Sequence, residues 1–325
     1  MTRRTWVRIA VGIAACVLSA CSVAIPEPST SPSLDGRGAV LDAQAERIAR
    51  QTFDEIDAAD TAADAALLDE RVSEGAALVR GVEYAVEAAG GSAPEVIVGD
   101  VQAFYTTDSD SWPRPLIGVT VPADPDDTPV VLVWSQGDAQ GLYELSSWAS
   151  MIPGAVLPAM PSLSTGASLL ALDASGFTMT PGEAIEQYVA LLNDGSDDFD
   201  QAFAPDPYRE GMFQARSSLS SSAKGRGGTY TDTIEANLDE SFALADAEGG
   251  ALVFVQLAVT SDFNVPGAQL TLLASADKAL LEGTLKSRVV YRYEDVVIVR
   301  LWPEGAETPP TVVAVGQHLV GVATS

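Results

Sequence analysis

The chain has 325 residues, of which 47% are hydrophobic, and its 45 acidic and 18 basic side chains give a formal net charge of −27. This apolar content is enough for a buried core, and the length suggests two domains. The acidity excludes nucleic acid as a partner, and it excludes electrostatic binding to anionic lipid head groups, because both depend on clustered lysine and arginine.

The N-terminus has the organisation of a bacterial lipoprotein signal. Three arginines flank the start of an apolar run from Trp6 to Ala20, and Cys21 follows small residues, which is the order that secretory processing recognises. The run is shorter than the roughly 20 residues of a membrane-spanning helix. We therefore predict a signal peptide over residues 1–20 and lipidation at Cys21. This places the protein on the extracytoplasmic face of the cell membrane, with the membrane as a partner through the lipid anchor.

Residues 21–38 are predicted to be the lipidated cysteine and a flexible tether. The segment after Cys21 is rich in proline and serine and has no apolar period, so it favours an extended chain. The other cysteine, Cys16, lies in the predicted signal peptide. No disulfide is therefore expected in the mature protein.

Residues 39–165 show two helical patterns followed by strand patterns. Apolar spacings of three and four predict a helix from Leu41 and a second over Leu68–Val86, which Gly90 and Gly91 end. Strands are predicted at Val96–Thr106, Leu116–Val121, Val130–Trp134 and Leu142–Trp148. We interpret this part as an N-terminal α+β module.

The same order returns over residues 179–325. Thr180, Pro181 and Glu183 form a capping-box helix start, and a second helix is expected near Arg209–Ala223. Strands are predicted at Thr229–Leu238, Ala251–Thr260, Gln269–Ala274, Leu285–Tyr293, Val296–Trp302 and Thr311–Ala323. The expected fold class is α+β, with two modules that each have helices followed by a curved antiparallel β-sheet.

This element order resembles the nuclear-transport-factor-2-like and cystatin-like superfamilies, in which a curved sheet wraps a long helix and can leave a cavity. Two phrases, residues 146–158 and residues 176–188, are similar to segments of actinobacterial envelope lipoproteins of unknown function. The resemblance implies no known substrate or cofactor, and fold alone does not determine function.

Sequence motifs for catalysis and metal binding fail on inspection. The acidic run Asp194–Asp200 has Phe199 where an EF-hand loop requires glycine. Ser221 and Lys224 match the S-x-x-K pattern, but the accompanying S-D-N and K-T-G elements are missing. His318 is the only histidine, which excludes sites built on several histidines. No catalytic residue, cofactor site or metal site is therefore assigned.

The expected function is that of a non-enzymatic binding or interaction component of the cell envelope, with an envelope protein as a possible partner. One alternative is an enzyme with a cavity in the C-terminal module that uses His318 as an acid or base. The other is a solute-binding lipoprotein, although such receptors need alternating βα units. Four tryptophans on or near strands, including Trp112, are expected to pack on the sheet or to form a binding platform.

Overall fold

The computed structural model describes residues 37–324 except 98, 123, 125–126 and 195–199. Cys21, the predicted signal peptide and nearly all of the predicted tether lie outside the described residues. Residues Leu34–Ser325 form one compact unit, which holds all four apolar clusters found among the described residues. This segment therefore carries its own core. In the part of the chain that the structure describes, no helix has the length and apolarity needed to cross a bilayer.

The strands form one curled, almost entirely antiparallel sheet in the order β1-β2-β3-β4-β10-β9-β7-β6-β5, and β8 pairs with β10 in parallel. The strand bounds are β1 Val101–Thr106, β2 Arg114–Thr120, β3 Val130–Gln136, β4 Glu144–Met151, β5 Leu169–Leu170, β6 Thr229–Ala245, β7 Ala251–Asn264, β8 Leu281–Glu282, β9 Arg288–Leu301 and β10 Thr311–Ala323.

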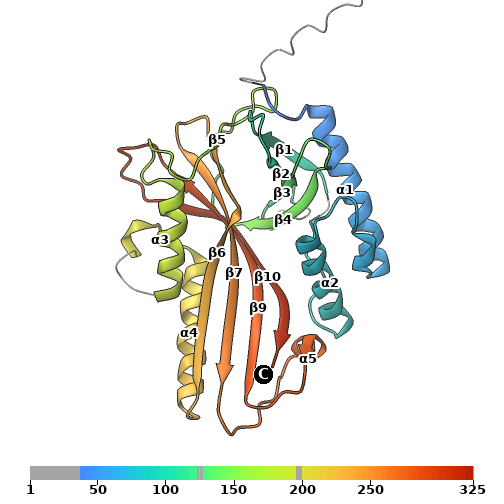
Figure 1. Ribbon diagram of the computed structural model, residues 1–325, viewed down its shortest axis with the longest axis vertical. Coiled ribbons are helices and arrows are strands. Elements are labelled where there is room, and N and C mark those ends of the chain that lie inside the picture. The colour runs from blue at the N-terminus through green and yellow to red at the C-terminus, as the bar shows by residue number, and fades with distance from the viewer. Residues whose placement is uncertain (1–36, 98, 123, 125–126, 195–199, 325) are drawn as a thin grey trace, which may run out of the picture. The chain divides into compact units, whose positions relative to one another are not determined.

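The helices flank this sheet on two sides (Figure 1). Their bounds are α1 Asp42–Ala62, α2 Glu74–Ala88, α3 Pro181–Asp194, α4 Pro207–Lys224 and α5 Ser275–Leu280, with short 3-10 turns at Ala65–Leu67 and Asp200–Ala202. The predicted α+β class is confirmed. The capping box is also confirmed: the Glu183 amide donates to Thr180 Oγ1 at 3.1 Å, and the Thr180 amide donates to Glu183 Oε2 at 2.9 Å.

The two-module arrangement is not confirmed, because the strands of both expected modules belong to one sheet. Strand β10 pairs with β9 along most of its length and also with β4, where Ala314 lies opposite Met151 and Val315 opposite Ser150. Residues of the 39–165 half and the 179–325 half therefore share a hydrogen-bonded ladder. The domain boundaries themselves stay a prediction.

Apolar side chains fill both faces of the sheet. The face under α1 and α2 contributes Leu132 and Trp134 to one cluster, and the face under α3 contributes Val253 and Val255 to another. A third cluster, which includes Ile298, joins strands from both halves on the faces turned away from these helices. Alternation along the strands therefore supplies two layers of core.

Two strand predictions are wrong. The segments predicted as Leu285–Tyr293 and Val296–Trp302 form the single strand β9, because Glu294 and Asp295 continue the ladder opposite Ala258 and Leu257. The polar pair does not form a turn, since Asp295 is buried and hydrogen-bonded. Gln269–Ala274 is a loop that precedes α5.

Candidate functional site

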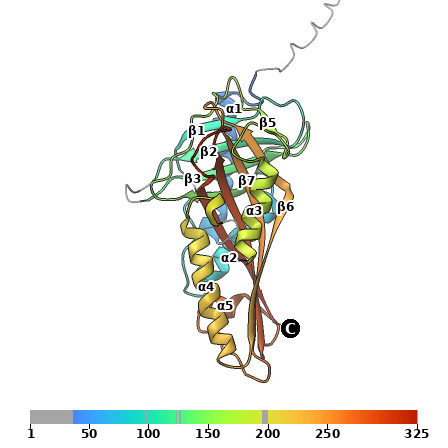
Figure 2. The ribbon, with the colours of Figure 1, turned by 90° about the vertical axis from the view of Figure 1, so that its left-hand side faces the viewer.

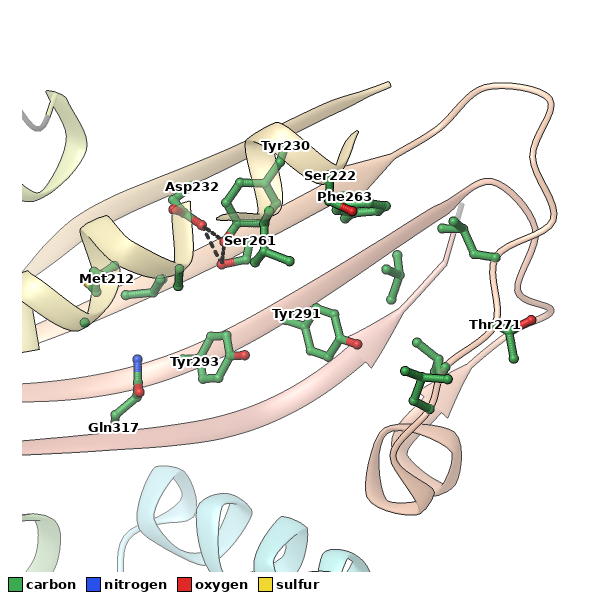
Figure 3. Close-up of a pocket in the computed structure, with 18 of the residues that line it drawn as sticks. Met212, Ser222, Tyr230, Asp232, Ser261, Phe263, Thr271, Tyr291, Tyr293 and Gln317 are labelled. Atoms are coloured by element: carbon green, nitrogen blue, oxygen red, sulfur yellow. Dashed lines mark hydrogen bonds between the residues drawn. The ribbon is translucent and has the colours of Figure 1, made fainter. Parts of the chain in front are cut away.

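A cavity of about 890 Å³ lies between α4, the strands β6, β7, β9 and β10, and the loop that follows β7 (Figure 3). Its volume is in the range of small-molecule sites, which are mostly apolar with a few polar groups. The side chains used below come from α4 (Tyr208, Met212, Ala215, Leu219), β6 (Tyr230, Asp232), β7 (Ser261, Phe263), β9 (Tyr291, Tyr293), β10 (Gln317) and the loop (Leu270, Leu272, Leu273). We call this cavity the α4 pocket.

The pocket lies between a helix and strands whose lining residues recur with the period of each element. On α4, Tyr208, Met212, Ala215 and Leu219 recur at spacings of three and four and so lie on one helix face. On the strands, the lining residues recur every second position, as Tyr291 and Tyr293 do on β9. A helix face and a sheet face therefore look toward each other across the cavity.

One wall of the pocket carries a polar network around Asp232, whose side chain is only 2% exposed. Tyr230 and Ser261 donate their hydroxyl hydrogens to Asp232 Oδ1, the latter at 2.7 Å (Figure 3). Arg216 Nε donates to Asp232 Oδ2 at 3.0 Å. The buried carboxylate is thereby paired with a cation and hydrogen-bonded, which offsets the cost of its burial. Burial and the hydrogen bond to Asp232 raise the pKa of Tyr230.

A second buried carboxylate lies beside the pocket, where the first turn of α4 meets β9. Tyr208 donates to Asp295 Oδ2 at 2.6 Å, and Asp295 is fully buried. Burial raises the pKa of Asp295 to about 7, because the low-dielectric surroundings disfavour the charged carboxylate. Tyr293 lines the cavity nearby, and burial raises its pKa to about 12. The tyrosines of the pocket therefore stay protonated at neutral pH and act as hydrogen-bonding groups.

The chemistry of this wall suits binding better than nucleophilic catalysis. A serine nucleophile needs a base that takes its proton. Ser261 donates a hydrogen bond to Asp232, but that carboxylate also accepts hydrogen bonds from Tyr230 and from the guanidinium of Arg216. No histidine or cysteine lines the α4 pocket among the described residues.

His318 does not face the α4 pocket. Its neighbour Gln317 lines that pocket, whereas His318 lies beside Trp148 with a ring-centroid separation of 4.8 Å and borders a separate cavity of about 170 Å³ under α2. Successive residues of a strand point to opposite faces, which explains the separation. The imidazole is 8% exposed, and burial lowers the pKa of His318.

The other residues singled out from the sequence do not meet at one site. Trp134 and Trp148 are buried in the core, and Trp112 is 39% exposed with Arg114 stacked over its ring. Ser221 and Lys224 lie on the last turn of α4. Most of the acidic run 194–200, and Cys21, lie outside the described residues.

Comparison with known families gives one match, which covers most of the chain. Residues 37–318 match the family described as "Domain of unknown function (DUF8094)", a description that names no activity. The chain belongs to this DUF8094 family. No curated protein and no solved structure matches the chain.

The α4 pocket was not predicted from the sequence. The available signal was the change of side-chain type along alternate positions of β7, from Val253, Val255 and Leu257 to Ser261 and Phe263. Hydroxyls and aromatic rings at core-facing positions indicate a wall that is not fully packed by apolar side chains.

Proposed function

We propose that the protein binds a small, neutral, amphipathic molecule in the α4 pocket and does so as a lipid-anchored component of the cell envelope. The observation that carries the proposal is the cavity of about 890 Å³ that the chain leaves open between α4 and the sheet. A close-packed interior has few voids larger than a water molecule. An opening of this size therefore accommodates a ligand.

The lining defines the chemical class of the ligand. Met212, Leu219 and Phe263 offer apolar contacts, and the Tyr293 hydroxyl and the Gln317 amide offer hydrogen bonds. The lining holds one acidic side chain, Asp232, and one basic side chain, Arg226, and Asp232 is paired with Arg216, so the wall does not select a charged ligand. The ligand expected from these contacts has an apolar body and a neutral hydroxyl, carbonyl or amide group.

The pocket mouth gives a further reason to expect an apolar ligand. Leu273 is 90% exposed and Leu219 is 38% exposed, and both line the cavity. Exposed apolar groups around an opening are typical of ligand grooves. A bound apolar molecule would cover these leucines.

A dye titration tests the proposal. The probe is the neutral apolar dye N-phenyl-1-naphthylamine, added to residues 34–325. Ala215→Trp places a large side chain in the cavity and is expected to weaken dye binding at least tenfold. Ser217→Trp adds the same ring to a position of α4 outside the lining and is expected to leave binding unchanged. Equal binding by both variants would refute ligand binding in this pocket.

The envelope location is a separate part of the proposal and rests on the N-terminal signal. Cys21→Ser removes the only thiol expected in the mature chain. Cell fractionation is expected to show the wild type in the membrane fraction after a wash without detergent and the variant depleted from it, because two acyl chains anchor stably. Retention of the variant at the wild-type level would contradict lipid anchoring.

The competing function is catalysis by His318, which the sequence analysis left open. The α4 pocket is on the opposite side of β10 from His318, so the two do not form one site. Turnover of a defined substrate that His318→Gln abolishes, with dye binding in the α4 pocket unchanged, would favour the enzyme over the binding protein.

A further inference from the structure

Three side chains that the α4 pocket does not use meet on the α2 side of β10. They are Glu83 of α2, Glu95 of the segment after α2, and His318 of β10. One carboxylate oxygen of each glutamate and one imidazole nitrogen lie within 4.8 Å of one another. We propose that these three residues bind one divalent transition-metal ion, for which Zn²⁺ is the reference ion.

The hydrogen bond and packing of His318 favour metal binding by its Nδ1 atom. Its Nε2 lies 3.2 Å from the carbonyl oxygen of Trp148. A carbonyl oxygen only accepts, so Nε2 carries the hydrogen of the neutral ring and the lone pair is left on Nδ1. Metal-bound histidines regularly donate their other ring N–H to a carbonyl or carboxylate in this way. The packing of the ring against Trp148 holds its orientation.

Glu95 is held in place by two neighbours on β4. Ser150 donates its hydroxyl to Glu95 Oε1 at 2.6 Å, and the Trp148 indole donates to Glu95 Oε2 at 3.0 Å. Each carboxylate oxygen has two lone-pair positions, so these bonds orient the group without using all of its acceptor capacity. Trp148 therefore positions two of the proposed ligands, His318 through its carbonyl and Glu95 through its ring.

The carboxylates around the proposed site outnumber the basic side chains. Arg80 binds Asp60 through Nε at 2.9 Å and Nη2 at 2.6 Å, and it binds Glu83 through Nη1 at 2.8 Å. Asp60, Glu83 and Glu95 carry three negative charges against this one guanidinium. Because half-buried charges without a counterion are costly, a divalent ion would neutralise the excess.

The ligand types select the ion. Imidazole suits zinc and its neighbours in the transition series, and carboxylate oxygens complete such sites. Bonds of about 2.0–2.2 Å place any two ligand atoms at most about 4.4 Å apart, so the three atoms need to approach only slightly. Glu83 and Glu95 are half-buried, which leaves them the freedom to do so. Three protein ligands leave a position for water.

Equilibrium dialysis with Zn²⁺ followed by metal analysis tests the proposal on residues 34–325 freed of metal by chelation. The expected result is one equivalent retained by the wild type, with at least tenfold weaker binding in His318→Gln and in Glu83→Gln. His318→Gln keeps a donor for the Trp148 carbonyl. Glu87→Gln is the matched control: it removes the same charge one turn further along α2, at an exposed position, and is expected to bind like the wild type.

Two outcomes would overturn the metal site. One is no retained zinc in a wild type whose circular dichroism shows it folded, and the other is equal retention by all four proteins, which would indicate scattered surface carboxylates. Glu83→Gln also removes a partner of Arg80, so His318→Gln decides the result if that variant unfolds. A parallel dialysis with Ca²⁺ is expected to show weaker retention, because calcium requires six to eight oxygen ligands.

Discussion

The helices α3 and α4 follow each other along one side of the sheet (Figure 2). The space under α3 is packed, whereas α4 borders the α4 pocket. Under α3, Leu191 and Leu192 are fully buried against Val253 and Val255. Under α4, Met212 faces the α4 pocket. The strands and their alternation are common to both regions, so the side chains at the alternate positions decide whether a helix closes on the sheet.

A pocket can thus be encoded by the side chains at alternate strand positions, without a change of fold. Under α3, leucines and Tyr188 pack with the valines of the sheet in one buried cluster, because their shapes allow interdigitation. Tyrosine and serine under α4 bring hydroxyls that need partners, and Tyr208 and Tyr230 find theirs in Asp295 and Asp232. These bonds hold the aromatic rings against the strands and leave the space beside α4 open.

The largest loss of stability is expected from a substitution in the packed region under α3. Leu191→Ala is expected to lower the free energy of unfolding by about 2–5 kcal/mol, because it removes buried methyl groups and leaves a void. Met212→Ala is expected to cost less than Leu191→Ala, about 1 kcal/mol, because Met212 is only partly buried against the same cluster and already borders a cavity. Urea denaturation of both variants measures the difference. Equal costs would show that α4 is packed as tightly as α3.

An effect of comparable size, which depends on pH, tests the burial of Asp295 beside the pocket. Asp295 has a pKa of about 7 in the folded protein against an ordinary value of 3.8, so the folded state binds its proton more tightly than the unfolded state. The stability that this group contributes is fully present below about pH 3.8 and is lost as the pH rises through 7.

Asp295→Asn removes this titration and keeps an acceptor for Tyr208. The stability of the variant relative to the wild type is expected to rise between pH 4.5 and 7.5, with a slope approaching 1.4 kcal/mol per pH unit. Chemical denaturation across this range measures it. Asp239→Asn, at an exposed position of β6, is the charge-matched control. A difference between Asp295→Asn and the wild type that stays flat with pH would contradict the burial argument.

The smallest expected effect concerns the start of α3. Thr180→Ala removes the side-chain oxygen that accepts from the Glu183 amide and is expected to cost about 1 kcal/mol. Glu183→Gln keeps the capping-box chemistry and is expected to cost less. Thermal denaturation of the two variants gives the comparison, and an equal loss in both would contradict the expectation that glutamine maintains the capping box.

Local patterns in the sequence predicted most elements of the fold, because helix caps and apolar periodicity act within a few residues. The pairing of Met151 with Ala314 was not predictable, since nothing in either segment identifies its partner. The same limit applies to the candidate sites. Glu83 and His318 lie far apart in the chain, and only the fold of α2 over β10 brings them together.

The place of β10 has a consequence for how the chain completes its fold. Among the described strands β10 comes last in the sequence but lies in the middle of the sheet, between β4 and β9. During synthesis from the N-terminus, β4 and β9 precede the strand that joins them. Both edges therefore stay open until Thr311–Ala323 arrives, and open edges invite pairing with other chains. A delay in folding until this strand is present would protect the protein from aggregation.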